Sequence, residues 1–280
     1  MPKSTDVPPE LRSLNKVFSQ LDYKWDYADS FRDFVDFLTE SFMPVRQGEY
    51  ERLQKKHGSL NWFVDMTREW VLVQDKMIAV DGTGGWYDAL GTFYETLASR
   101  GKKSSLGQFF TPPEVCEVMV RINGFTTDMT GKGLSIQDPA SGSGRMLLAA
   151  HVTAPGNYQY AADLDPICTK MAAANMCLHG CVGQAVCMDS LNPDDWRFGY
   201  AINRSLAWTG VPTIEPIQKE QCRAWNLAQQ QKADEAARQA APTTAPVPAP
   251  AVPKTARIDT PVRPQPEPTN AGKFGQLKLF

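Results

Sequence analysis

The segment QDPASGSGRML, residues 137–147, joins the end of one apolar run to the start of another. The run before it, LSIQD (134–138), has the length of a buried strand, and the run after it, RMLLAAHV (145–152), has the composition of a helix. Gly142 and Gly144 in the turn remove the Cβ atoms that would keep a ligand away from the main chain. The segment therefore predicts a strand, a ligand-binding turn and a helix. A tight turn without a ligand is the alternative.

Strand-like and helix-like segments continue to alternate after this turn. YQYAADLD (158–165) and QAVCMD (184–189) are strand candidates, and PICTKMAAANMCLHG (166–180) between them is typical of a helix. Further along, FGYAINRSLAW (198–208) and VPTIEPI (211–217) supply one or two more strands. This order predicts an α/β fold with a parallel sheet and crossover helices.

The first hundred residues have helical periodicity instead. One apolar stripe with helical spacing is formed by Phe31, Phe34, Val35, Leu38 and Phe42. A second is formed by Trp62, Met66, Trp70, Val73 and Met77. We expect a helical N-terminal region at residues 1–103, followed by the α/β core at residues 104–216.

The chain beyond the core is polar. Residues 217–241 are compatible with a polar helix, and residues 242–274 are rich in proline and alanine with little apolar bulk. We expect the second segment to be a disordered linker. Residues 275–280 then contain a polar anchor and three apolar residues that can dock in extended form into a partner's pocket: Gln276, Leu277, Leu279 and Phe280. A stray apolar terminus is the alternative.

Composition narrows the class of protein. The formal net charge is −2, so a nucleic-acid partner would need a local basic face. The first residues lack an apolar signal segment, and no run of about 18 apolar residues is present. The six cysteines show no disulfide-scaffold spacing, and CLHGC (177–181) lacks the paired spacing of structural zinc. We expect a cytoplasmic protein with reduced thiols, no membrane span and no metal ion.

Acidic residues follow three successive strand candidates. Asp138 precedes the glycine turn and suits a ligand with a cationic end, whereas a dinucleotide fingerprint would need glycine at Leu147. Asp163 and Asp189 end the next two strands, where they can accept hydrogen bonds from ribose hydroxyls and from an adenine amine. The pattern predicts S-adenosylmethionine, which carries an ammonium group beside its sulfonium.

Four segments in this order resemble the adenine-specific DNA methyltransferases, and the modification subunit of type I restriction systems most of all. They are LGQFFTPPEV (106–115), DPASGSGRML (138–147), ADLDPICTKMAAANMCLHG (162–180) and MDSL (188–191). DALGTFYETL (88–97) resembles the helix that precedes the first segment in that subfamily. The resemblance implies a Rossmann-like fold dependent on S-adenosylmethionine, and methyl transfer to the N6 amine of an adenine flipped out of DNA.

The resemblance also implies a cofactor site. The methionine end would meet Gln108, Phe109, Phe110 and Thr111, and the main loop would be Asp138, Ala140, Ser141, Gly142 and Gly144. Ribose and adenine would meet Asp163 and Leu164, with Asp189 and Ser190 at the adenine amine. The TPPE segment additionally predicts a helix start with Thr111 as N-cap, Pro112 as first helical residue and Glu114 closing a capping box.

The family's [DNS]-P-P-[YFW] motif, which accepts hydrogen bonds from the target amine and stacks on the base, is not found. The nearest text is NPDDW (192–196), whose Asn192, Pro193 and Trp196 are the candidate catalytic residues; a turn is the alternative. Too little chain follows for a complete methyltransferase sheet and a target-recognition domain, so a truncated sheet and a separate specificity subunit fit this length.

Two functions of different class follow. One is a DNA adenine-N6 methyltransferase of a restriction-modification system or of phage or plasmid DNA modification. The other is a catalytically inactive module that binds S-adenosylmethionine and acts as a scaffold or regulator; methyl transfer to something other than DNA is a third. The C-terminal QLKLF resembles the Q-L-x-L-F peptide with which bacterial proteins bind the sliding clamp. Clamp binding would tether either kind of protein to DNA.

Overall fold

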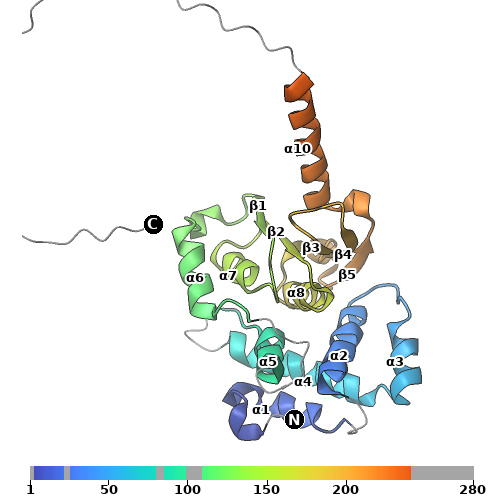
Figure 1. Cartoon of the computed structure of the whole chain (residues 1–280). Coiled ribbons are helices and arrows are strands. Elements are labelled where there is room, and N and C mark those ends of the chain that lie inside the picture. The colour runs from blue at the N-terminus through green and yellow to red at the C-terminus, as the bar shows by residue number, and fades with distance from the viewer. Residues whose placement is uncertain (1–2, 22–25, 80–84, 99–108, 241–280) are drawn as a thin grey trace, which may run out of the picture. The chain divides into compact units, whose positions relative to one another are not determined.

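Helices make up the N-terminal part of the chain (Figure 1). The computed structural model describes residues 3–21, 26–79, 85–98 and 109–240. The described residues up to 237 belong to one compact unit. The N-terminal elements are η1 Ser4–Asp6, η2 Pro9–Leu11, α1 Arg12–Phe18, α2 Tyr27–Ser41, α3 Glu49–His57, α4 Asn61–Ile78 and α5 Ala89–Ala98.

The predicted apolar stripes are confirmed as the core of this helical region. Helix α2 starts where the Asp26 carboxylate accepts a hydrogen bond from the N–H of Ala28 (2.7 Å), which satisfies one of the free amides of the first turn. Its apolar face is fully buried, and so are Met66 and Trp70 of α4. Trp62 and Met77 are partly buried at the margin of the same cluster.

A mixed sheet of five strands forms the second layer (Figure 1). The elements are α6 Pro113–Ile122, η3 Thr127–Met129, β1 Ser135–Asp138, α7 Arg145–Thr153, β2 Tyr158–Asp163, α8 Pro166–Leu178, β3 Val182–Met188, β4 Trp196–Ile202, α9 Leu206–Thr209, β5 Ile214–Ile217, η4 Lys219–Gln221 and α10 Arg223–Ala240. The strand order is β1-β2-β3-β4-β5. All strands predicted from the sequence are present, and the α/β class is confirmed.

The expectation of a parallel sheet is only half right. Strands β1, β2 and β3 are parallel, and helices α7 and α8 connect them. Strands β4 and β5 run antiparallel to their neighbours. The physical reason is the length of the connection: residues 189–195 link β3 to β4, and a parallel return needs a crossover of about a dozen residues or more.

Helix α8 lies between the sheet and the N-terminal helices. Asp165 caps its start by accepting a hydrogen bond from the N–H of Ile167 (3.0 Å), and Pro166 occupies the first helical position. Ile167 and Met171 belong to the core of the helical region, whereas Ala172 and Met176 belong to the core of the sheet. Because both faces of α8 are covered, apolar residues occur on both of them, although the helix also carries Thr169, Lys170 and Asn175.

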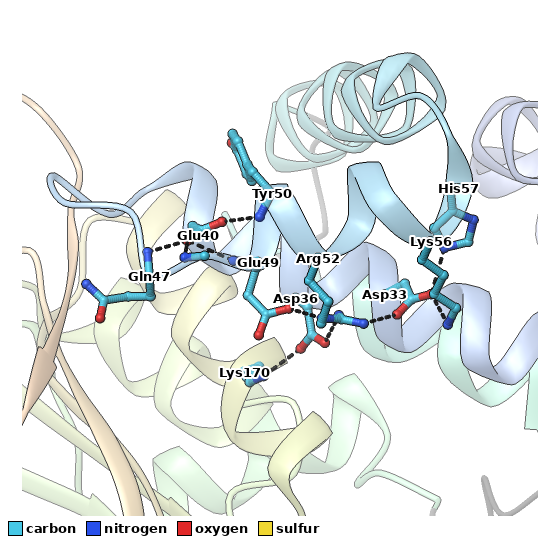
Figure 2. A network of polar contacts seen from close by, with 11 residues as sticks. Asp33, Asp36, Glu40, Gln47, Glu49, Tyr50, Arg52, Lys56, His57 and Lys170 are labelled. Atoms are coloured by element: carbon cyan, nitrogen blue, oxygen red, sulfur yellow. Dashed lines mark hydrogen bonds and ion pairs between the residues drawn. The ribbon is translucent and has the colours of Figure 1, made fainter.

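Ion pairs also join the two layers (Figure 2). Asp36 of α2 accepts hydrogen bonds from Lys170 of α8 (2.5 Å) and from Arg52 of α3 (2.8 Å). Asp33, one turn earlier, accepts from Arg52 (3.1 Å) and Lys56 (2.5 Å). Burial alone would raise the pKa of Asp33, but its donors, Lys56 first, outweigh burial and hold the pKa below its ordinary value. The network fixes α2 and α3 against the core helix.

The predicted cap of α6 is wrong by one residue. The N-cap is Pro112, Pro113 is the first helical residue, and Thr111 lies outside the helix without capping it. Two consecutive prolines explain the shift, because proline restricts the residue before it to an extended conformation.

The six cysteines are free and buried. Burial raises the pKa of Cys116 to about 11, which keeps its thiol protonated at neutral pH. In the part of the chain that the structure describes, no group of three or more His, Cys, Asp or Glu residues is arranged to hold a metal ion. No helix among the described residues is long and apolar enough to cross a membrane.

The polar helix expected at residues 217–241 corresponds to α10, although residue 217 is still the end of β5. The linker at 242–274 and the docking peptide with Gln276, Leu277, Leu279 and Phe280 lie outside the described residues. Gln108 also lies outside them.

Candidate functional site

The glycine turn after β1 is held by main-chain contacts to the neighbouring strand. The N–H of Ser141 donates to the carbonyl of Ala162 (3.0 Å), the last residue but one of β2. The N–H of Gly142 donates to the carboxylate of Asp163 (2.8 Å), which ends β2. Gly144 then begins α7 as its N-cap, with φ +92°. The turn therefore lies across the carboxyl ends of two parallel strands, where ligands bind in open α/β sheets.

Gly142 is required by a close approach. Its φ is +53°, and a Cβ placed there would lie 2.6 Å from Cδ1 of Phe110. A side chain at this position is disfavoured on both counts, because the left-handed conformation is strained and the ring occupies the space. Gly144 is less crowded, since a Cβ there would meet Ala172 at 3.4 Å. The sequence predicted that glycine leaves room here for a ligand; at Gly142 the space that a Cβ would take is filled by the ring of Phe110 instead.

The two acids nearest the turn have different surroundings. Both carboxylate oxygens of Asp163 accept main-chain hydrogen bonds, one from Gly142 and the other from Asp165 (2.9 Å). Asp138 accepts one from the N–H of Ala140 (3.1 Å) and is half-buried. Burial raises the pKa of Asp138, and the neighbouring carboxylate of Asp163 raises it further. A nearby cation would stabilise the charged form of this carboxyl and lower its pKa.

A cavity of about 290 Å³ opens at this turn. It is lined by Phe109, Phe110, Thr111, Asp138, Ala140, Ser141, Gly142, Ser143, Arg145, Met146 and Asp163. The hydroxyl of Ser141 is buried and has no hydrogen-bond partner within the described chain. A buried hydroxyl without a partner beside a cavity can be satisfied by a water molecule or by a polar atom of a ligand. The donors and acceptors present thus fit a small ligand with polar groups and one cationic end.

Most of the residues predicted to bind the cofactor line this cavity. Eight of them do: Phe109, Phe110, Thr111, Asp138, Ala140, Ser141, Gly142 and Asp163. The four described residues that do not are Gly144, Leu164, Asp189 and Ser190. The hydroxyl of Ser190 donates to the carbonyl of Pro139 (2.6 Å), so the turn after β3 lies beside the glycine turn. The carbonyl of Leu164 accepts from Arg197 (2.9 Å).

A buried ion pair that was not predicted from the sequence supports the wall of the cavity. Arg145, the first residue of α7, donates through Nε to Asp88 (2.7 Å) and through Nη2 to Glu95 of α5 (2.8 Å). Its Nη1 donates to the carbonyl of Thr111 (3.2 Å), and its guanidinium lies 5.3 Å from the ring centre of Phe110. Burial alone would lower the pKa of Arg145, but the Asp88 and Glu95 carboxylates outweigh burial and hold it above its ordinary value.

Asp88 satisfies donors from three parts of the chain. Its carboxylate accepts hydrogen bonds from Arg145, from the hydroxyl of Ser143 (2.5 Å), from the N–H of Gly91 (2.7 Å) and from the amide of Asn175 (2.8 Å). This side chain is 1% exposed. Asp88 therefore ties α5, the glycine turn and α8 together, and acts as a positioning residue for the cavity.

A sequence signal for this pair existed. Asp88 and Glu95 are seven residues apart, which places both on one face of a helix whose other residues are uncharged. Arg145 is likewise the only charged residue of RMLLAAHV. Charges at otherwise apolar positions are buried only when they are paired. The pairing could not be predicted, because Arg145 is 57 residues from Asp88 and 50 from Glu95 in sequence.

The NPDDW segment forms the turn between β3 and β4. The N–H of Asn192 donates to the carbonyl of Asp189 (3.1 Å), and the N–H of Asp195 donates to that of Asn192 (2.9 Å). Trp196 begins β4 and packs in a cluster with Trp225. None of Asn192, Pro193 and Trp196 lines the cavity. These hydrogen bonds are those of a turn. The catalytic role of Asn192, Pro193 and Trp196 stays a prediction, and their position gives it no support.

Comparisons with known proteins agree with the motifs. A sequence model of the family described as N-6 DNA Methylase matches residues 86–205. No curated protein matches the chain. Among solved structures, the chain is similar to the crystal structure of the type I restriction-modification system methyltransferase subunit from Streptococcus thermophilus, with 22% sequence identity and a TM-score of 0.30. The match covers 62% of this chain and 38% of that one, so this chain spans well under half of the subunit's length.

Proposed function

We propose that this chain, whose residues 86–205 match the N-6 DNA methylase family, binds S-adenosylmethionine and takes part in methyl transfer to the N6 amine of adenine in DNA. The observation that carries the proposal is the cavity at the glycine turn, where Asp138, an unpaired Ser141 hydroxyl and the bare main chain of Gly142 meet. The reaction would take place in the cytoplasm of a bacterium or a phage-infected cell, where the buried thiols remain reduced.

The residues that would hold the cofactor have separate tasks. Asp138 would pair with the ammonium of its methionine end, because a carboxylate with a raised pKa gains most from a neighbouring cation. Asp163 would accept from the ribose hydroxyls with the lone pairs that its main-chain bonds leave free. Phe110 would pack against the cofactor from the opposite side of the turn. The bound cofactor supplies a sulfonium with a reactive methyl group, so the protein has to position and desolvate rather than activate it.

Methyl transfer is tested with purified chain, DNA without methylation and S-adenosylmethionine labelled with tritium in the methyl group. We expect label in N6-methyladenine after digestion of the DNA to nucleosides, when any required partner is present. Calorimetry with S-adenosylmethionine alone is the control. Heat of binding without label in adenine under all conditions would favour the scaffold function, and no heat would contradict the proposed cofactor.

The affinity for S-adenosylmethionine should depend on pH through Asp138. A raised pKa means that this carboxyl becomes protonated at a higher pH than an ordinary aspartate, and the protonated form cannot pair with an ammonium. The affinity is therefore constant near neutral pH and falls as the pH drops through the raised pKa, by up to about tenfold per pH unit. Titration calorimetry across acidic pH measures it. Asp138→Asn should bind more weakly at pH 7 and lose this decline, and parallel pH profiles would contradict the assignment.

We also propose that the C-terminal peptide binds the bacterial sliding clamp. A linker of about 30 residues reaches roughly 90 Å when extended, and such a tether raises the local concentration of the domain at DNA. A separate specificity subunit would then supply recognition of the target sequence.

Deletion of residues 275–280 should lower binding to purified clamp by about tenfold or more, because the apolar anchors are lost. Lys278→Ala is the matched control, since position x of Q-L-x-L-F carries no anchor and its loss should change little. Surface plasmon resonance on immobilised clamp measures both variants. Equal binding by the deletion variant and the intact chain would rule out this docking mode.

A further inference from the structure

A second cavity, of about 470 Å³, opens at the end of the sheet opposite the glycine turn. Strand β2 runs from one cavity to the other, because Tyr158 at its start lines the second cavity and Asp163 at its end lines the cavity at the glycine turn. Five steps along a strand span roughly 17 Å. Among the described residues the two cavities have no lining residue in common. The second cavity is therefore a separate site with room for one small ligand.

One face of the sheet forms a wall of the second cavity. Tyr158 and Tyr160 alternate with the fully buried Gln159 along β2, so both rings lie on the same face. Their partners in β3 are Val182 and Gln184, and all four residues line the cavity. The next positions of both strands on this face are buried in a cluster with the first turn of α10. Both faces of a parallel sheet are normally covered, so the two tyrosines mark the place where this cover ends.

Exposed aromatic rings gather at the opening of the second cavity. Trp208 of α9 is 75% exposed, Tyr158 is 46% exposed, and both line the cavity. The guanidinium of Arg223 lies 5.2 Å from the ring centre of Tyr160. Single exposed apolar residues are normal on a protein surface, whereas aromatic residues gathered around a cavity are typical of a binding site. A planar ring that stacks on these side chains would bury much of their exposed surface.

The charge of the second cavity favours an anionic ligand. Among the described residues that line it, Arg204 is the only one of the four charged types, so no carboxylate faces the ligand. The guanidinium of Arg204 lies 3.9 Å from the carboxylate of Glu215, and its side chain is 53% exposed. An exposed ion pair of this length is weak, and the guanidinium stays accessible to a ligand. A guanidinium binds phosphate through two parallel hydrogen bonds.

We propose that the second cavity binds a nucleotide whose base is not stacked in a duplex, with the base against Trp208 and Tyr158 and a phosphate at Arg204. Aromatic side chains beside an arginine recognise this combination of a planar ring and a phosphate. A base pair inside a duplex cannot bind in this way, because its faces are already stacked on its neighbours. The nucleotide is therefore either free or part of a single strand. This inference goes beyond methyl transfer and does not depend on it, since the cofactor would bind at the other end of the sheet.

The second cavity should accept different bases with similar affinity. Three side-chain amides line it, and all of them are hydrogen-bonded to main-chain groups of the chain: Asn157, Gln184 and Asn203. Few of their donors and acceptors remain to read the edge of a base. Stacking tolerates any base, because every base has an aromatic face.

The test uses the purified full chain without S-adenosylmethionine. Fluorescence anisotropy measures binding of a labelled thymidine single strand of about 12 nucleotides and of a duplex of the same length, with adenosine monophosphate as competitor. Trp208→Ala and Arg204→Gln change the cavity at exposed side chains. Leu72→Ala on α4 and Arg121→Gln on α6 are the matched controls, because they make similar changes at exposed side chains that do not line the cavity. A strand with 5-bromodeoxyuridine is also cross-linked by ultraviolet light and mapped by mass spectrometry.

We expect the single strand to bind at least about tenfold more tightly than the duplex and to cross-link to Trp208 or Tyr158. Trp208→Ala and Arg204→Gln should each lower the affinity by about tenfold, whereas the controls should change it less than about twofold. Displacement of the strand by adenosine monophosphate would show that one free nucleotide is a sufficient ligand, and a strand that it does not displace would identify single strands as the ligand.

Four results would overturn the proposal. They are no binding of either probe, equal affinity for single strand and duplex, equal affinity of the cavity variants and their controls, and cross-links confined to residues 109–111, 138–146 or 241–280. Calorimetry with S-adenosylmethionine tests the proposed function separately, because neither Trp208 nor Arg204 lines the cavity at the glycine turn.

Discussion

Gly142→Ala should reduce the affinity for S-adenosylmethionine by about 100-fold or more, because a shift of the glycine turn by about 1 Å misplaces every group around the cofactor. The new Cβ would lie 2.6 Å from Cδ1 of Phe110, and the residue would have to keep φ +53°. Either the ring or the turn must move, and the ring is held between Gly142 and the guanidinium of Arg145. Isothermal titration calorimetry on the purified variant measures the loss.

Gly124→Ala is the matched control for this substitution. Gly124 also has a positive φ, +77°, but a Cβ there would have no heavy atom within 4 Å. The variant should therefore lose about 1–2 kcal/mol of stability from its backbone conformation and bind S-adenosylmethionine like the parent. If Gly142→Ala bound as tightly as Gly124→Ala, the close approach at the turn would have no part in cofactor binding.

Asp88→Ala should lower the free energy of unfolding by about 3–5 kcal/mol, which is a large share of the stability of a domain. The substitution removes the acceptor of four donors and leaves the guanidinium of Arg145 buried with Glu95 as its remaining carboxylate partner. A buried charge that loses a partner costs far more than an exposed one, because water cannot replace the contact. Urea unfolding followed by circular dichroism gives the difference.

Asp29→Ala serves as the control for an ion pair in the same part of the chain. Asp29 accepts from Arg32 (2.9 Å), and its side chain is 58% exposed, so its loss should cost less than about 1 kcal/mol. Equal destabilisation by the two substitutions would show that the buried network around Asp88 does not stabilise the fold.

Local patterns were sufficient to predict the parts of the site that are close together in sequence. The strand before Asp138, the glycine turn and helix α7 are where periodicity and composition placed them. Eight of the residues predicted to bind the cofactor line one cavity, because a turn and the strand ends beside it lie at the same edge of a parallel sheet. Seven of the ten residues of the two helical stripes are buried, and Phe42, Trp62 and Met77 are partly buried.

Features that depend on distant pairing were missed or misjudged. The antiparallel direction of β4 and β5 follows from a short connection and from which edge of the sheet was free. The support of the cavity comes from Arg145 meeting Asp88 and Glu95, more than 45 residues away in sequence. Trp196, a candidate for base stacking, packs instead with Trp225 from helix α10.

The α/β class, the positions of the strands and the glycine turn with its acidic neighbours were predictable from local sequence, because each of these follows from residues within a few positions of one another. Three features required the folded chain: among the described residues β1 lies at an edge of the sheet, α6 exposes a second apolar face, and one arginine links three segments around the cavity. These depend on which surfaces meet when the chain folds, and the free energy of such contacts is shared between residues that no local pattern connects.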